Sequence, residues 1–241
     1  DQGYALAQSN LAVRLDSGDG VEKNGAEAMR YFRLAADQGN ARAQNALGVR
    51  LLRGEVVEKD EAEAARYFRL AADQELAEAQ FNVGYQLSLG TGVEQDRAEG
   101  VRYFRLAADQ GYARAQYELG LGLIHGKAVE KDEAEGARYL RLAADQDHAE
   151  ARNALGVCLL QGTGVAKDEA EAVRLANDSH LGLNAYVFTS DRERGERLAE
   201  RIEAGSVLVN DVFTNYSSEV PFGGVKQSGF GRVHGAEALR T

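Results

Sequence analysis

The sequence contains few of the residues that mark several classes of protein. Its 241 residues include one cysteine, one proline and no tryptophan. A lone cysteine, Cys158, cannot form a disulfide within the chain, so a reducing compartment and a cytoplasmic location are favoured, with the compartment left open. A single proline is typical of a helical chain, because proline disrupts helix interiors.

Basic residues and long apolar runs are also scarce. The 28 Lys and Arg are outnumbered by 38 Asp and Glu, for a formal charge of -10. No basic cluster interrupts this balance, so neither nucleic acid nor a membrane surface is expected as a partner. No apolar run approaches the roughly 20 residues that a membrane-spanning helix needs. The histidines are scattered without the spacing of metal ligands, so no metal site is expected.

What the chain does contain is a repeat. The string YFRLAADQ recurs at intervals of 36 residues, with one substitution in its last copy, beginning at Tyr31, Tyr67, Tyr103 and Tyr139. A fixed period of this length predicts an α-solenoid, in which each unit packs only on its neighbours. Because residues 1–3 match residues 37–39, the chain is expected to begin inside a repeat.

Each unit is predicted to hold two helices. The second helix follows a residue that can cap it, with a glutamate three positions later; the capping residues are Asn24, Asp60, Asp96, Asp132 and Asp168. This is the spacing of a capping box, in which the cap accepts a backbone N–H and the glutamate reaches back. In the first helix, Ala43, Leu47, Gly48 and Leu51 fall on one face. Glycine costs helix stability there, so another helix is expected to pass close by.

The helix pair with Ala-x3-Leu-Gly, a Gly-x-Gly-Val turn and a Tyr-Phe-Arg-x-Ala-Ala run resembles the Sel-one-like repeat, a longer relative of the tetratricopeptide repeat. The resemblance covers residues 1–174 and implies a mainly α protein, a right-handed α-solenoid of helix-pair repeats. It also implies an adaptor that holds a protein or peptide on the concave face of the superhelix. The family often has an aromatic residue where this chain has leucine, at Leu15, Leu51, Leu87, Leu123 and Leu159, which should alter packing volume more than the fold.

Positions that vary between units are candidates for the binding face, because a solenoid buries the positions that recur. On the first helices these partner-binding candidates are Arg42, Asn45, Arg50, Glu78, Phe81, Gln86, Arg114 and Tyr117. Phe81 and Tyr117 stand one repeat apart and suit the anchoring of a peptide side chain. The alternative is that both rings fill space between repeats. The acidic EKDEAE runs suggest basic partners, although carboxylates at helix N-termini are also favoured by the helix dipole.

The repeat pattern breaks at Leu175, so a second domain, or part of one, is expected over 175–241. Apolar periodicity predicts a strand over 185–189, a helix over 191–205 and a strand over 206–210. Strand, helix and strand in this order normally form a crossover between parallel strands. The tail is therefore predicted to be a small α/β fragment that proteases cut more readily after Asn177 than before it.

Three segments of the tail, LANDSHLGL, AGSVLVN and PFGGVKQSGFGR, resemble in order the C-terminal part of the catalytic domain of the aldehyde dehydrogenase superfamily, near its semialdehyde and aromatic-aldehyde branches. The resemblance spans about 168–241. It implies that the substrate-tunnel wall and its supporting loop include Asn210, Phe222, Gly223, Gly224, Ser228 and Gly229. Two departures are visible: Val233 stands where the family usually has an acidic residue, and the resemblance ends at Thr241, short of the usual C-terminal continuation.

Several parts that aldehyde oxidation needs are not recognisable in the sequence. The family's reaction uses a cysteine nucleophile, a glutamate base and a domain that holds NAD(P). Cys158 lies outside the resembling segment, and no Gly-x-Gly-x-x-Gly follows a predicted strand. No catalytic residue is therefore predicted, and NAD(P) is expected only if a dehydrogenase fold completes the chain.

Three hypotheses stay open. The first is a repeat adaptor whose dehydrogenase-like tail is a remnant or a docking piece. The second is a fragment of an NAD(P)-dependent aldehyde dehydrogenase, in which the tail completes a dehydrogenase fold supplied by another chain or by sequence that is missing from this one. The third is an accidental join of two genes. The segment KDEAEAVRLAND fits both a repeat helix and a dehydrogenase helix, which favours recombination within one shared helix.

Overall fold

The computed structural model of the chain describes residues 2–178 and 190–203, together with the backbone of short strands at 181–182, 184–187, 206–209, 222–223, 225–226 and 232–233. The chain divides into two compact units, Asp1–Ala151 and Arg152–Thr241, and each is described by itself. Helix α9 (Ala149–Gln161) begins in the first unit and continues in the second.

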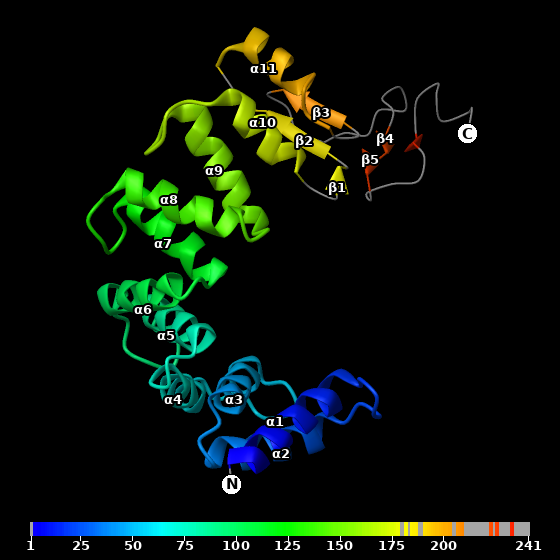
Figure 1. The fold of residues 1–241 in the computed structure, drawn as a ribbon, viewed down its shortest axis with the longest axis vertical. Helices are drawn as coiled ribbons and strands as arrows, with labels where there is room; N and C mark the ends of the chain where they lie inside the picture. Colours follow the sequence, from blue (N-terminus) through cyan, green and yellow to red (C-terminus); the bar gives the residue numbers. More distant parts are fainter. Residues whose placement is uncertain are drawn as a thin grey trace. The chain divides into compact units, whose positions relative to one another are not determined.

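The first unit is a row of helix pairs (Figure 1). Its helices are α1 (Gln2–Ser17), α2 (Gly25–Asp37), α3 (Ala41–Arg53), α4 (Glu61–Ala72), α5 (Ala77–Leu89), α6 (Arg97–Asp109), α7 (Ala113–His125) and α8 (Glu133–Ala144). Each helix packs against the next one along the chain, so the pairs stack in sequence order. The predicted α-solenoid is confirmed, with an odd-numbered first helix and an even-numbered second helix in each repeat.

The predicted caps begin the second helices. The side-chain oxygens of Asn24, Asp60, Asp96 and Asp132 accept the backbone N–H three residues later, at 2.8–3.1 Å. The glutamate at that third position turns toward an arginine further along the same helix. Glu99, for example, lies 2.6 Å from Arg102. Such exposed pairs add only about 0.5 kcal/mol each, so the cap is the main signal that starts the helix.

The hydrophobic core runs between each repeat and its neighbour. Ala43, Leu47 and Leu51 of α3 are at most 3% exposed, on the face that the sequence predicts. One buried cluster joins α1, α2 and α3, a second joins α3, α4 and α5, and a third joins α6, α7 and α8. Each first helix therefore packs on both of its neighbours.

The mid-helix glycine makes room for a side chain of the second helix. A Cβ atom at Gly48 would lie 2.7 Å from Cε1 of Phe68, and a Cβ atom at Gly120 would lie 3.0 Å from Cγ of Leu140. Real Cβ atoms essentially never approach another atom as closely as the first distance. The expected close approach of a second helix is confirmed.

A glutamine pair ties together the two helices of a repeat. A glutamine near the start of the first helix accepts the side-chain amide of a glutamine at the end of the second helix; these contacts, at 2.6–2.8 Å, join Gln8 with Gln38, Gln44 with Gln74, Gln80 with Gln110 and Gln116 with Gln146. Gln44 also donates to the carbonyl of Ala36 at 3.2 Å, and Gln116 to that of Ala108 at 3.1 Å. Each of these two glutamines thus links three helices.

The loop inside each repeat holds two residues in the left-handed backbone region, two positions apart, and the first is glycine in every repeat. At the second position the φ angles lie between 60° and 71°, at Gly20, Val56, Gly92, Ala128 and Gly164. Glycine adopts this conformation freely, whereas the Cβ atom of any other residue strains it, most of all a β-branched one. Val56 is 59% exposed, so the packing of its side chain offsets little of this backbone strain.

The second unit continues from α9 into α10 (Glu169–Asn177). The predicted domain boundary after residue 174 falls inside α10, which is continuous, and Leu175 is 8% exposed. Arg152 stands where the earlier repeats carry their first-helix glutamine. It donates to the carbonyl of Asp178 at 2.5 Å, and its guanidinium lies 3.8 Å from the Asp178 carboxylate.

The remainder of the unit contains short strands and one helix. They are β1 (Leu181–Gly182), β2 (Asn184–Val187), α11 (Arg192–Ala199), β3 (Ser206–Val209), β4 (Phe222–Gly223), β5 (Val225–Lys226) and β6 (Arg232–Val233). Strands β2 and β3 pair in parallel, with Asn184 opposite Ser206 and α11 between them in the chain. The pairs β1 with β5 and β4 with β6 are antiparallel.

Polar contacts join α10 to α11 and the residues that follow it. The carboxylate of Glu169 accepts from Arg194 Nε at 3.0 Å and from Arg201 Nη1 at 3.1 Å. The side-chain amide of Asn177 donates to the carbonyl of Arg201 and accepts the N–H of Glu203, each at 2.8 Å. The last repeat helix and the tail helix are therefore linked at both ends of α10.

Candidate functional site

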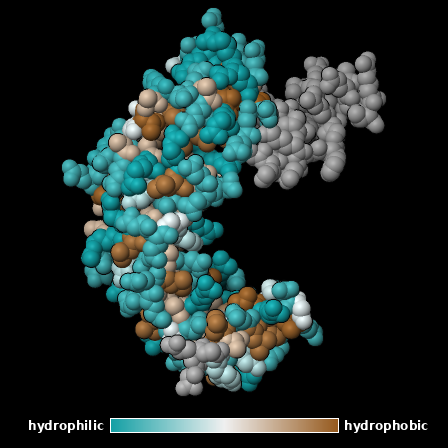
Figure 2. All heavy atoms as spheres, in the orientation of Figure 1, coloured by the Kyte–Doolittle hydropathy of each residue, from teal (hydrophilic) through white to brown (hydrophobic). Residues whose placement is uncertain are grey.

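The first helices present one buried face and one open face. The open face differs from repeat to repeat: it carries Ala46, Asn82 and Glu118 at one position, Val49, Tyr85 and Leu121 at a second, and Arg53, Leu89 and His125 at a third. On α5, Tyr85 is 46% and Leu89 is 56% exposed. Figure 2 shows that the visible surface of the first unit is mostly hydrophilic, with apolar residues in separate patches. Each repeat thus presents its own chemistry.

Three of the predicted partner-binding residues are charged and exposed. Arg42, Glu78 and Arg114 lie in the first turns of α3, α5 and α7, and Glu150 holds the same position in α9. The sign of the charge therefore alternates along the repeats. Burial raises the pKa of the Tyr112 hydroxyl; Arg114 opposes this shift, whereas Glu78 adds to it.

Asn45, another predicted residue, is buried within a polar contact between repeats. It is 9% exposed. Its Oδ1 accepts from Asn82 Nδ2 at 2.8 Å, and its Nδ2 donates to Glu78 Oε2 at 3.4 Å. Asn45 therefore fixes side chains of the open face more than it presents its own.

Arg50 and Gln86 occupy one position in successive repeats, and both are largely covered. The side chain of Arg50 is 13% exposed, pairs with Asp16 at 2.5 Å, and places its guanidinium 4.5 Å from the ring centre of Phe32. Gln86 is 2% exposed. The structure therefore puts neither side chain fully on the open face.

The rings of Phe81 and Tyr117 make equivalent contacts one repeat apart. The ring centre of Phe81 lies 5.4 Å from that of Tyr112, and the ring centre of Tyr117 lies 5.1 Å from that of His148. Tyr112 and His148 are the residues directly before α7 and α9. Both rings thus pack toward the next repeat, yet each stays partly exposed.

Glu118 is a functional candidate that the sequence reasoning missed. It lies next to Tyr117 in α7, is partly buried, and burial raises the pKa of its carboxyl group. Among the described residues, none donates a hydrogen bond to this carboxylate or forms an ion pair with it. The equivalent residues in the two preceding repeats are Ala46 and Asn82, which are uncharged. The appearance of a charged residue at this position is the feature of the sequence that could have identified Glu118.

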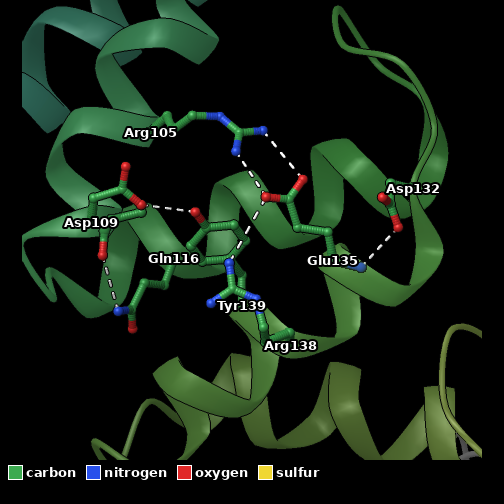
Figure 3. Close-up of polar contacts among 8 residues, drawn as sticks. Arg105, Asp109, Gln116, Asp132, Glu135, Arg138 and Tyr139 are labelled. Atoms are coloured by element: carbon green, nitrogen blue, oxygen red, sulfur yellow. Dashed lines mark hydrogen bonds and ion pairs between the residues drawn. The ribbon is translucent and has the colours of Figure 1, made fainter.

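A separate polar network joins α6 to α8 (Figure 3). Arg105 Nη1 donates to Glu135 Oε1 at 2.8 Å, and this contact raises the pKa of the Arg105 guanidinium. Tyr139, 3% exposed, donates its hydroxyl to Asp109 Oδ1 at 2.8 Å. Burial, followed by this hydrogen bond, raises the pKa of Tyr139. The network satisfies buried polar groups between neighbouring repeats, which is a structural role.

The predicted tunnel residues of the tail are described only in part. Phe222 and Gly223 form β4, opposite Val233 and Arg232 of β6. Asn210 and Gly224 lie outside the described residues, as do the loop residues Ser228 and Gly229.

Neither a metal cluster nor a membrane-spanning helix is found in the described part of the chain. Over the described residues, no group of three or more His, Cys, Asp or Glu side chains could hold a metal ion. Within the same residues, every helix is too short or too polar to cross a bilayer.

Comparison with known proteins identifies the repeat region. The Sel1 repeat family matches residues 5–40, 41–76, 77–112, 113–148 and 149–177, which together make up most of the chain. The chain belongs to the Sel1 repeat family. Each of the first four Sel1 repeats contains one helix pair, as 41–76 contains α3 and α4. A solved Sel1 repeat protein from Oxalobacter formigenes is 32% identical with a TM-score of 0.67, over 73% of this chain and 70% of that one.

A second family, the aldehyde dehydrogenase family, matches residues 164–241. The 4,4'-diapolycopene aldehyde oxidase of a Methylomonas species is 59% identical over 68 residues, which are 28% of this chain and 13% of the enzyme. The NADP-dependent succinate-semialdehyde dehydrogenase of Deinococcus radiodurans is 53% identical over 60 residues, 25% of this chain and 12% of the enzyme. The chain therefore spans about an eighth of the length of these relatives.

The Sel1 repeat match and the aldehyde dehydrogenase match overlap at residues 164–177, the segment that contains α10. The prediction that one helix fits both patterns is confirmed. The contacts of Glu169 and Asn177 with the α11 region show how this helix serves both parts: it ends the repeats and supports the tail.

Proposed function

We propose that the chain is a protein-interaction scaffold whose Sel1 repeats hold a partner protein or peptide along the open face of the first helices, on the concave side of the solenoid. The observation that supports this is the contrast between the two faces of these helices. The buried face keeps small and apolar residues, such as Ala43, Ala79 and Ala115, whereas the open face changes from repeat to repeat and exposes Tyr85 and Leu89 on α5. A constant core with a variable surface lets each repeat contact a different part of an extended partner.

The predicted residues take different parts in this proposal. Arg42, Glu78 and Arg114 supply exposed charges that orient a partner. Phe81 and Tyr117 supply the exposed edges of packed rings. The covered residues Asn45, Arg50 and Gln86 hold the helices that carry the surface.

The test compares two exposed leucines. Leu89 lies on a first helix and is 56% exposed, whereas Leu70 lies on a second helix and is 43% exposed. We expect Leu89→Ser to reduce capture of the native partner from an extract of the source cells, and Leu70→Ser to leave it unchanged. Circular dichroism and the melting temperature of both variants check the fold. Equal capture by both variants and the parent chain would remove the open face from the proposal.

For the tail, we propose a small α/β fragment, similar to the C-terminal part of an aldehyde dehydrogenase catalytic domain, that does not oxidise aldehydes by itself. The position of the chain's only cysteine supports this. Cys158 lies in α9, outside the matched segment 164–241, and is 5% exposed. A reactive cysteine needs an accessible thiolate, so Cys158 does not suit the role of nucleophile.

The alternative is that the tail completes an NAD(P)-dependent aldehyde or semialdehyde dehydrogenase contributed by another chain, which would then also supply the cofactor site. The identity of the tail to an aldehyde oxidase, at 59%, and to an NADP-dependent succinate-semialdehyde dehydrogenase, at 53%, supports this alternative. An NAD(P)-linked oxidation assay on the purified chain, and on material co-purified from the source, separates the two. Turnover by the purified chain alone would refute the non-catalytic tail, and turnover only with a co-purified dehydrogenase would support the alternative.

A further inference from the structure

Four neighbouring side chains of the first unit form a small surface that we call the Tyr117 site: Tyr117 and Glu118 of α7, and His148 and Glu150 at the start of α9. We infer that the Tyr117 site binds a lysine or arginine side chain of the partner. This inference rests on the proposed scaffold function and names the chemistry that one repeat recognises.

The ring of Tyr117 is held in place and partly open. It stacks on the ring of His148, with 5.1 Å between ring centres and 25° between ring planes. The side chain of His148 is 15% exposed, so the stack leaves the imidazole largely covered. A fixed aromatic ring attracts an ammonium or guanidinium group placed over its face.

Two carboxylates lie beside this ring without a cation. Burial raises the pKa of the Tyr117 hydroxyl, and the charges of Glu118 and then Glu150 add to the shift. Glu118 is partly buried, and no described cation pairs with it. A carboxylate removed from water gains strongly from a charged hydrogen-bond donor.

The histidine of the site does not supply this cation. Nδ1 of His148 lies 3.3 Å from the carboxylate of Glu150, but it also accepts the backbone N–H of Ala151 at 3.3 Å. A ring nitrogen that accepts a hydrogen bond does not carry the proton that an ion pair with Glu150 would need. The two carboxylates therefore remain available to a partner.

The preceding repeat carries a related ring contact, with 56° between ring planes in place of 25°, and different charges. Phe81 and Tyr112 repeat the ring contact, but Asn82 stands in place of Glu118, and Arg114 in place of Glu150. That position holds a cation of its own, Arg114, and the acid that acts on its ring, Glu78, already accepts a hydrogen bond from Asn45. The selectivity for a basic side chain is thus specific to the Tyr117 site and does not follow from the repeat fold.

The experiment measures binding of a fluorescein-labelled peptide of alternating lysine and glycine to the full chain by fluorescence anisotropy, at near-physiological salt. A peptide with norleucine in place of lysine keeps the length and apolar stem but removes the charge. We expect the lysine peptide to bind and the norleucine peptide not to. Glu118→Gln should weaken binding about tenfold. Tyr117→Phe should keep most of the affinity, and Tyr117→Ala should lose it.

The matched control is Glu130→Gln, which removes the same charge from an exposed loop position. Its affinity should equal that of the parent chain. Equal weakening by Glu118→Gln and Glu130→Gln would show attraction to the acidic surface as a whole and overturn the inference, as would equal binding of both peptides or no binding of either. The scaffold proposal is tested separately: loss of partner capture in Leu89→Ser with unchanged capture in Glu118→Gln would retain the scaffold and reject this site.

Discussion

Gln86 of α5 and Arg50 of α3 hold the same position in successive repeats, but only Arg50 has a polar partner for its side-chain nitrogens among the described residues. Arg50 pairs with Asp16 at 2.5 Å, whereas Nε2 of Gln86 is buried and donates to no hydrogen-bond partner. The residue that corresponds to Asp16 one repeat later is Leu52. The repeat has thus replaced an acceptor with an apolar side chain and left the amide opposite it unsatisfied.

Replacing Gln86 with leucine should stabilise the protein. A buried donor without a partner costs about 1–3 kcal/mol, and leucine removes that cost at similar volume. Gln116→Leu is the matched variant, because Gln116 is also buried but holds both Gln146 and Ala108. It should destabilise by a similar amount. Urea unfolding of the two variants gives the comparison, and a loss of stability in both would mean that Gln86 is satisfied.

Replacing Val56 with glycine should also stabilise the protein. Val56 has a φ angle of 69°, where the other repeats mostly use glycine, and it is 59% exposed. Relief of the left-handed strain is worth about 1 kcal/mol. Val21→Gly, at the next position of the equivalent loop but outside the left-handed region, should instead destabilise because glycine adds freedom to the unfolded chain. The same sign for both variants in thermal unfolding would contradict the strain argument.

Glu118 should make stability depend on pH in a defined direction. Burial raises the pKa of its carboxyl group in the folded chain, so the folded state keeps this proton to a higher pH than the unfolded state does. Below about pH 4 both states are protonated, and the group has no effect on stability. As pH rises toward neutrality, the charge destabilises the fold. The parent chain should therefore lose stability relative to Glu118→Gln between about pH 4 and pH 7.

Melting temperatures of the parent chain and Glu118→Gln across that range give the measurement. If the two melting temperatures differ by the same amount at every pH, the substitution acts through packing and not through the charge of Glu118. A gain in stability together with weaker binding of the basic peptide would mark Glu118 as a residue retained at a cost to the fold.

Glu169 should control how firmly the tail is held to the last repeat. It faces both Arg194 and Arg201, and Glu169→Gln weakens both contacts. These pairs are partly exposed, so together they contribute only about 0.5–1 kcal/mol. We expect faster cleavage after Asn177 during limited proteolysis, by roughly two- to fivefold. Glu193→Gln, on the exposed surface of α11, should change nothing. Equal cleavage rates for Glu169→Gln and Glu193→Gln would show that other contacts hold the tail to the last repeat. If the parent chain is cut as readily before Asn177 as after it, the predicted protease sensitivity of the tail is wrong.

The helices, their caps and the packed glycines could be predicted from sequence because each depends on local spacing. Asp60 needs only the N–H three residues later, and Gly48 shows its role by recurring in the middle of a helix. The glutamine pairs could not be predicted in the same way. The sequence repeats every 36 residues, but Gln44 and Gln74 are 30 residues apart, a separation set by how two helices fold back on one another.

The candidate site was predictable in part for a related reason. Variation between repeats singled out Phe81 and Tyr117, but variation alone does not separate an open side chain from a covered one. The positions of Asn45 and Gln86 vary between repeats, yet both side chains are buried. Glu118 is a candidate because it lies next to Tyr117 and its partial burial raises the pKa of its carboxyl group. Burial depends on neighbours from other helices, which a single position in the sequence does not reveal.

Arg152 decides where the array can be lengthened by protein engineering. A glutamine amide both donates and accepts, so it can pair with a second glutamine, but a guanidinium group only donates. An inserted copy of residues 77–112 brings both Gln80 and Gln110 and is complete in itself. An ordinary second helix joined to the last repeat would have to turn the oxygen of its terminal glutamine amide toward Arg152, which already donates to Asp178. Arg152→Gln would restore the glutamine pair at that end, whereas growth in the middle requires no substitution.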